Sequence, residues 1–293
     1  MELGRVGVWS GNFATMPASA LRDAVPKIES LGFRTLWFPE SFAKEAFALA
    51  ATLLAAGEHT IAASGIANIW ARDATAMVNG GRTLEDAYPG RLLLGIGVSH
   101  APSAERRGGD YRKPFSMMVD YLDAMEAAPY GGPPIPQDPP LVLAALGPKM
   151  LDLAARRTKG AHPYFVPVEH TALAREIMGP DALLAPEQAV VLATDPDEAR
   201  AIARSHTVTY LALPNYRNNL LRLGWSEQDT AASGSDALVD AVVAWGNVDA
   251  IEDRVAAHLA AGADHVSIQV LNGPVEEFPI RELTELAPAL LDL

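Results

Sequence analysis

The chain of 293 residues contains no cysteine. Disulfide bonds, thiolate metal sites, iron–sulfur clusters and a cysteine nucleophile are therefore excluded. The absence fits a reducing compartment, and we expect the protein in the cytoplasm. Apolar residues make up 49% of the chain and charged residues 20%, which is ordinary for a globular protein that buries a core without disulfides.

Long apolar runs and an excess of basic residues are also missing. No apolar run reaches the roughly 18 residues that a membrane span needs. The first residues, MELGRVGVWSG, lack the basic start and apolar core of a signal peptide. The formal net charge of −13 argues against nucleic acid as a partner, because phosphate backbones bind basic surfaces. A small molecule is the expected substrate.

Short apolar segments alternate with helical patterns along the chain. In the clearest unit, the apolar segments Ile61–Asn68 and Arg91–Val98 flank a helical pattern at Arg72–Asp86. Near-continuous apolar runs are typical of parallel strands covered on both faces, and two of them joined by a helix form a right-handed βαβ unit. The other predicted strands are Arg5–Trp9, Thr35–Phe38, Leu141–Ala145, Ala161–Val166, Gln188–Ala193 and His265–Val270.

Eight such alternations predict one domain, a (β/α)8 barrel. The stretch Asp195–His258 is helical almost throughout, which is longer than one crossover needs. We therefore expect a helical insertion at about residues 206–250, before the last strand, with helices at Asn215–Leu223 and Leu238–Trp245. Functional residues of barrels lie at the C-terminal ends of strands. Those ends carry Trp9, Ser10, Glu40, Ser41, Asn68, Ser99, His100, Leu146, Gly147, His162, Tyr164 and Asn272.

Three of these candidates can exchange a proton. His100 fits a catalytic acid or base, or an ordinary loop histidine. Glu40 follows a buried strand, where a lone carboxylate is costly unless it is functional or paired, for example with Arg72 or Arg5. His162 fits a core histidine as well as a functional one.

One segment is suited to an anion. Gly147, Pro148 and Lys149 begin a predicted helix, whose free backbone N–H groups attract negative charge. Gly95 and Gly97 lie inside a strand and do not form a dinucleotide fingerprint. No metal is expected, because the paired histidine and carboxylate motifs of metal hydrolases are missing, and no Gly-x-Ser-x-Gly elbow indicates a serine nucleophile.

Four segments resemble a known family: GFRTLWFPES, IAASGIANIWARDATAMV, GRLLLGIGVSHAP and LAALGPKMLDLAARRTKGAHPYF. They resemble the luciferase-like flavin monooxygenase superfamily, and within it the actinobacterial branch that uses the deazaflavin coenzyme F420. The resemblance covers nearly the whole chain. It implies an oxidoreductase that moves a hydride between deazaflavin C5 and an organic substrate, and a homodimer. It also implies a bulge in the third strand with a cis peptide bond at Gly65–Ile66.

The resemblance further implies site residues. Ser41 stands where many F420-dependent members have a proton-transferring histidine, so His100 and Glu40 are the catalytic candidates. The implied cofactor-binding residues are Gly65, Ile66, Asn68, Val98, Ser99, His100, Ala144, Ala145, Leu146, Gly147, Pro148, Lys149, Met150, His162 and Tyr164.

Two alternatives stay open. The same fold could bind FMN and use oxygen as a monooxygenase, or bind a flavin or deazaflavin without turnover. The polyglutamate tail of F420 favours a basic groove, for which Arg106, Arg107, Arg112 and Lys113 are the candidates. The 101–114 loop and the 206–250 insertion are the expected walls of the substrate site.

Overall fold

The structure is a computed structural model that describes residues 1–271 and 278–293. Within this part of the chain, ten strands form one sheet in the order β7-β6-β5-β4-β3-β2-β1-β10-β8-β9, and every pair is parallel. The strands are β1 (Val6–Trp9), β2 (Thr35–Pro39), β3 (Ile61–Asn68), β4 (Leu92–Gly97), β5 (Leu141–Leu143), β6 (Gly160–Ala161), β7 (Leu183–Leu184), β8 (Glu187–Val191), β9 (Val243–Trp245) and β10 (Val266–Val270).

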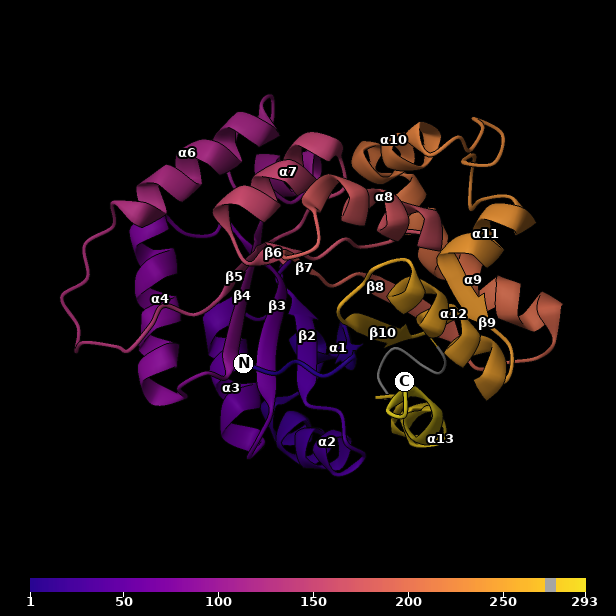
Figure 1. Cartoon of the computed structure of the whole chain (residues 1–293), viewed down its shortest axis with the longest axis horizontal. Helices are drawn as coiled ribbons and strands as arrows, with labels where there is room; N and C mark the ends of the chain where they lie inside the picture. Colours follow the sequence, from indigo (N-terminus) through magenta and orange to yellow (C-terminus); the bar gives the residue numbers. More distant parts are fainter. Residues whose placement is uncertain (272–277) are drawn as a thin grey trace.

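Helices lie around this sheet (Figure 1). They are α1 (Asn12–Thr15), α2 (Ala18–Ser30), α3 (Ala46–Ala56), α4 (Ala74–Ala87), α5 (Ala101–Arg106), α6 (Pro114–Glu126), α7 (Pro148–Arg157), α8 (Val168–Met178), α9 (Pro196–Leu211), α10 (Pro214–Arg222), α11 (Asp236–Val242), α12 (Val248–Ala260) and α13 (Ile280–Leu290). In the described residues, no helix is long and apolar enough to cross a membrane.

The sheet curls because one segment hydrogen-bonds on both of its sides. β7 and β8 stand far apart in the strand order, yet only Ala185 and Pro186 separate them along the chain. On one side Ala185 N–H donates to the Ala161 carbonyl at 3.0 Å. On the other side Ser267 N–H donates to the Pro186 carbonyl at 3.0 Å. The predicted α/β class with a parallel sheet is therefore confirmed. The sheet has ten strands where a (β/α)8 barrel predicts eight, because β7 and β9 are additional short strands.

Several elements differ from the sequence-based prediction. The helix predicted at Leu238–Trp245 ends at Val242, and Val243–Trp245 pairs with β8 as a strand. β6 is shorter than predicted, because Pro163 has no N–H to donate and Phe165 has a left-handed backbone (φ 57°). The predicted candidate Asn272 lies outside the described residues.

The third strand carries the expected bulge. Phe38 pairs with Ser64 and Pro39 with Ile66, so Gly65 is an extra residue in β3. The Ser64 hydroxyl donates to the Gly95 carbonyl at 2.8 Å and accepts from the Gly95 N–H at 2.9 Å, which restores the ladder locally. The predicted cis bond at Gly65–Ile66 is wrong, because no peptide bond of the described residues is cis. With Ser64 bridging the strands, the bulge forms with trans peptide bonds.

A carboxyl group is buried where β8 begins. The Glu187 side chain accepts a hydrogen bond from the Phe165 N–H at 3.1 Å, while Oε1 has no partner in the described part of the chain. Burial raises the pKa of Glu187 to about 8, despite the opposing hydrogen bond from Phe165. The neutral acid is therefore the form that the folded protein favours.

Replacing Glu187 with glutamine should stabilise the protein increasingly as pH rises. Because the folded pKa is raised, the contribution of Glu187 to stability is fully present below about pH 4.5 and is lost as pH rises through about 8, whereas glutamine keeps the acceptor without titrating. Thermal unfolding from pH 5 to 9 measures the difference. Glu58→Gln, at an exposed position, is the matched control, and its melting temperature should differ from that of the wild type by the same amount at every pH. A difference that is likewise independent of pH for Glu187→Gln would contradict the raised pKa of Glu187.

Candidate active site

A cavity of about 590 Å³ opens at the C-terminal ends of the strands. Most of the predicted site residues line it: Glu40, Gly65, Ile66, Val98, Ser99, His100, Ala144, Ala145, Leu146, Gly147, Met150, His162 and Tyr164. Three predicted cofactor contacts are not among the lining residues. Asn68 is fully buried and accepts from the Trp70 N–H at 3.0 Å, while Pro148 and Lys149 form the first turn of α7.

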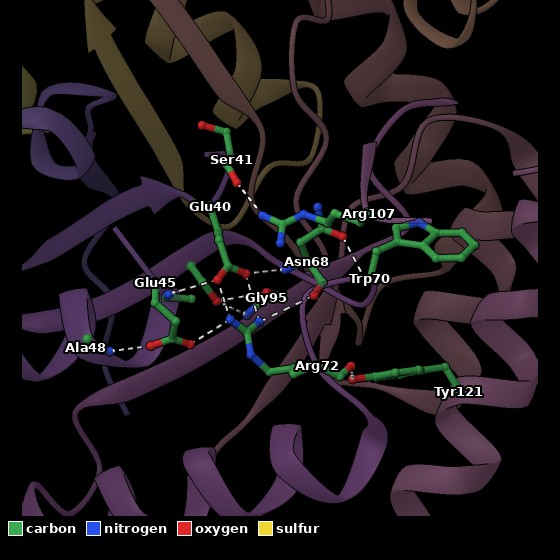
Figure 2. A network of polar contacts seen from close by, with 12 residues as sticks. Glu40, Ser41, Glu45, Ala48, Asn68, Trp70, Arg72, Gly95, Arg107 and Tyr121 are labelled. Carbon is green, nitrogen blue, oxygen red and sulfur yellow. Dashed lines mark hydrogen bonds and ion pairs between the residues drawn. The ribbon is translucent and has the colours of Figure 1, made fainter. Parts of the chain in front are cut away.

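Glu40, which lines the cavity, forms a buried ion pair with Arg72 (Figure 2). The Glu40 carboxylate also accepts from the Asn68 N–H at 2.7 Å and from the Ala46 N–H at 3.0 Å. Its two oxygens thus bind the end of β3, the start of α3 and the guanidinium of Arg72. Arg72 also contacts Glu45 at 2.6 Å.

This network explains why a carboxylate stands at residue 40. The ion pair with Arg72, which the sequence left open as an alternative, is confirmed. A proton-transfer role for Glu40 stays a prediction, and the network disfavours it, because donors already occupy both carboxylate oxygens. Among the catalytic candidates, the geometry favours His100.

His100 follows β4 and faces helix α10. Its Nδ1 lies 3.1 Å from Asn215 Oδ1, and its ring centroid lies 5.3 Å from that of Tyr216. Ser99 has a left-handed backbone (φ 55°), and its carbonyl accepts from the Tyr111 hydroxyl at 2.8 Å. Burial lowers the pKa of His100, which the bond to Asn215 partly opposes. The imidazole is therefore neutral at pH 7 and can accept a proton.

Tyrosines form one wall of the cavity. The Tyr164 hydroxyl lies 2.7 Å from Gln269 Oε1 and 2.9 Å from the Tyr210 hydroxyl. Since an amide oxygen only accepts, Tyr164 donates to Gln269 and accepts from Tyr210. Tyr216 completes the wall, with its ring centroid 5.2 Å from that of Tyr210. The Tyr210 ring is tilted by 52° to the Tyr164 ring and by 87° to the Tyr216 ring, so the wall offers ring faces and edges to an aromatic or apolar ligand.

A candidate binding site for an anion lies elsewhere in the cavity wall, at the start of α7. Gly147 is the N-cap of this helix and provides no side-chain cap. A Cβ built on Gly147 would lie 3.8 Å from both terminal nitrogens of Arg222. Arg222 also donates to Asn219 Oδ1 at 2.9 Å, which orients it. A helix N-terminus and a guanidinium together suit a phosphate group.

The basic loop is arranged differently from the expected groove. None of Arg106, Arg107, Arg112 and Lys113 is among the residues that line the main cavity. The guanidiniums of Arg106 and Arg107 lie 5.3 and 5.2 Å from the centre of the exposed Phe42 ring. Arg112 pairs with Asp110. Arg107 instead borders a neighbouring hollow of about 530 Å³ beside Arg72.

Sequence reasoning missed Asn215, Tyr210, Tyr216 and Arg222. All four lie on α9 and α10, which belong to the expected insertion. No spacing rule connects them to His100 or Gly147, because the contacts depend on how the helices fold back over the sheet. The run of polar and aromatic residues in TYLALPNYRNN could have indicated the first three, while Arg222 lies just beyond it.

Comparison with known proteins decides the family. The family model described as luciferase-like monooxygenase matches residues 3–265. The chain belongs to this family. The resemblance inferred from the four segments is thereby confirmed.

Individual relatives of this luciferase-like protein include F420-dependent ones. A Mycobacterium tuberculosis protein named as a candidate coenzyme F420-dependent oxidoreductase, Rv3520c, is 24% identical over 350 aligned positions, which cover 98% of this chain and all of the relative. A solved F420-dependent secondary alcohol dehydrogenase, in complex with an F420–acetone adduct, is 14% identical with a TM-score of 0.77, and 99% of each chain is covered.

A third relative uses another cofactor. The oxygenating constituent of 3,6-diketocamphane monooxygenase from Pseudomonas putida, in complex with FMN, is 15% identical with a TM-score of 0.68, and 98% of each chain is covered. At these identities the two solved structures show a shared fold.

Replacing Arg72 with methionine should destabilise the protein by about 3–5 kcal/mol, because it leaves the buried Glu40 carboxylate without its counter-charge. Chemical unfolding of the purified variant measures the loss. Arg156→Ala is the matched control, since its pair with Asp152 is exposed on α7 and should contribute less than about 1 kcal/mol. Equal losses in the two variants would show that Glu40 and Arg72 do not support the fold.

Proposed function

We propose that the protein is an F420-dependent oxidoreductase that transfers a hydride between the deazaflavin and a small organic substrate. The observation that carries the proposal is a cavity with a bulged strand at Gly65 on one side and an anion-binding end at Gly147 and Arg222. The F420-dependent relatives support the choice of cofactor.

The cavity residues fit such a cofactor. A volume of about 590 Å³ is in the range of small-molecule sites. Gly65 and Ile66 would contact the ring, Ala144 and Ala145 would leave it room, and Gly147 with Arg222 would hold the phosphate of the tail. When bound, the deazaflavin supplies a ring carbon, C5, that gives or accepts a hydride.

His100 is the residue we assign to proton transfer. Asn215 holds its Nδ1, so Nε2 would take the proton of a substrate hydroxyl during oxidation and return it during reduction. Helices α9 and α10 and the 101–114 segment would exclude water and shape the substrate site, with the tyrosine wall against an apolar part of the substrate. Glu40 would position this end of the sheet. A homodimer and a cytoplasmic location remain predictions.

An FMN-dependent monooxygenase is the second candidate. The relative solved with FMN favours it, as does the position of the basic loop outside the main cavity, because FMN has no polyglutamate tail to bind. Fluorescence titration of the purified protein with F420 and with FMN separates the two. Tighter binding of F420 supports the proposal, tighter binding of FMN supports the alternative, and binding of neither contradicts both.

Arg222→Gln should weaken binding of FMN and F420 about tenfold, because it removes the cation beside the N-terminus of α7. Riboflavin, which lacks the phosphate, should bind the wild type and Arg222→Gln with equal affinity. Arg217→Gln is the matched control on the same helix, since Arg217 pairs with Glu227 and does not line the cavity. An equal loss for riboflavin would place the phosphate elsewhere.

His100→Ala should lower turnover about 10²- to 10⁴-fold without changing cofactor affinity. In the wild type, activity should persist to below pH 6.5, because burial lowers the pKa of His100 and the base must be neutral. Asn215→Asp should move this acid limb to higher pH, since a carboxylate favours the imidazolium. The pH profile of kcat in the three proteins tests the assignment, and an unchanged limb in Asn215→Asp would remove His100 as the base.

A further inference from the structure

Two ring nitrogens at the cavity wall lack a hydrogen-bond partner among the described residues: Trp9 Nε1 and His162 Nε2. Both side chains line the cavity, although Trp9 is only 6% exposed and His162 only 1%. Trp9 ends β1 and His162 follows β6, so separate parts of the sheet bring them here. Buried polar groups are nearly always paired, so two unpaired ones in one cavity indicate a ligand contact.

The chemistry of each nitrogen is fixed. An indole N–H can only donate. His162 Nδ1 lies 2.7 Å from the Ala185 carbonyl, which can only accept, so Nδ1 carries the hydrogen and Nε2 presents a lone pair. Burial lowers the pKa of His162 to about 4, which keeps the ring neutral. The pair therefore offers one donor and one acceptor.

Both nitrogens border the same small space beside Gly65. A Cβ built on Gly65 would lie 2.6 Å from Trp9 Nε1 and 3.3 Å from His162 Nε2. Any side chain at residue 65 would fill this space, so glycine leaves it open to the cavity that it lines.

We propose that Trp9 Nε1–H and His162 Nε2 form a subsite for a neutral group that both donates and accepts a hydrogen bond. A carboxylate would meet the lone pair of His162, and an ammonium group would meet the N–H of Trp9, so both are disfavoured. A hydroxyl of the substrate and the lactam edge of a deazaflavin or flavin ring share the required chemistry. The subsite rests on the proposed function for this choice of ligands.

The structure contains a second tryptophan–histidine pair, whose ring nitrogens hydrogen-bond to each other. Trp37 Nε1 donates to His265 Nε2 at 3.0 Å, both residues are buried, and neither is among the cavity-lining residues. Trp37→Phe is therefore the control for Trp9→Phe in thermal unfolding of the ligand-free protein. Both variants lose the same part of a buried indole, so both should lower the melting temperature, and Trp37→Phe should lower it more, because the N–H of Trp9 has no partner to lose.

Binding measurements on wild type, Trp9→Phe and His162→Phe test the subsite. The ligands are F420, FMN, cyclohexanol and its methyl ether, which can accept but not donate. If the lactam occupies the subsite, Trp9→Phe and His162→Phe weaken cofactor binding about tenfold. If a hydroxyl occupies it, cofactor affinity is kept, Trp9→Phe weakens cyclohexanol, and the preference for alcohol over ether disappears in His162→Phe.

The outcomes separate this inference from the proposed function. Wild-type affinities for all four ligands in Trp9→Phe would overturn the subsite, while tight wild-type binding of F420 would still support the proposed function. If the wild type binds neither cofactor, the proposed function fails, and the alcohol–ether comparison on the cofactor-free protein decides the subsite.

Discussion

The buried ion pair between Glu40 and Arg72 is the interaction on which this end of the sheet depends. Glu40 lies at the end of β2, and its carboxylate binds backbone N–H groups at the end of β3 and the start of α3. Arg72 in turn precedes α4, and its carbonyl accepts from the Tyr121 hydroxyl of α6 at 2.9 Å. One charged pair thus connects two strand ends and three helices (Figure 2) at the edge of the cavity that Glu40 lines. Removing either charge would leave the other buried and unpaired.

A second constraint is the bulge of β3. Ser64 replaces a missing ladder contact with its own hydroxyl, and Gly95 must lack a side chain, since a Cβ there would lie 2.0 Å from the Ser64 carbonyl oxygen. The bulge re-aims Gly65 and Ile66 toward the cavity. Local strand chemistry therefore determines where a flat ligand can approach the backbone, before any ligand contact is considered.

Much of this arrangement was predictable from the sequence. Buried parallel strands have a strong apolar signal, and polar residues at their ends, such as Ser99 and His100, mark the active edge. The failures have physical causes. Val243–Trp245 became a strand because an exposed edge of β8 was available to it, a tertiary effect that helical periodicity does not record. The Asn68 side chain binds the Trp70 N–H and does not line the cavity, and nothing in the local sequence distinguishes these two orientations.

The hydrogen bond between His100 and Asn215 joins two parts of the chain with different tasks. His100 follows the strand β4, while Asn215 lies on α10, and both line the cavity. If His100 transfers the proton as proposed, a change in this helix that admits a new substrate would also alter the basicity and orientation of the histidine. An altered substrate preference would then be accompanied by a shifted pH optimum.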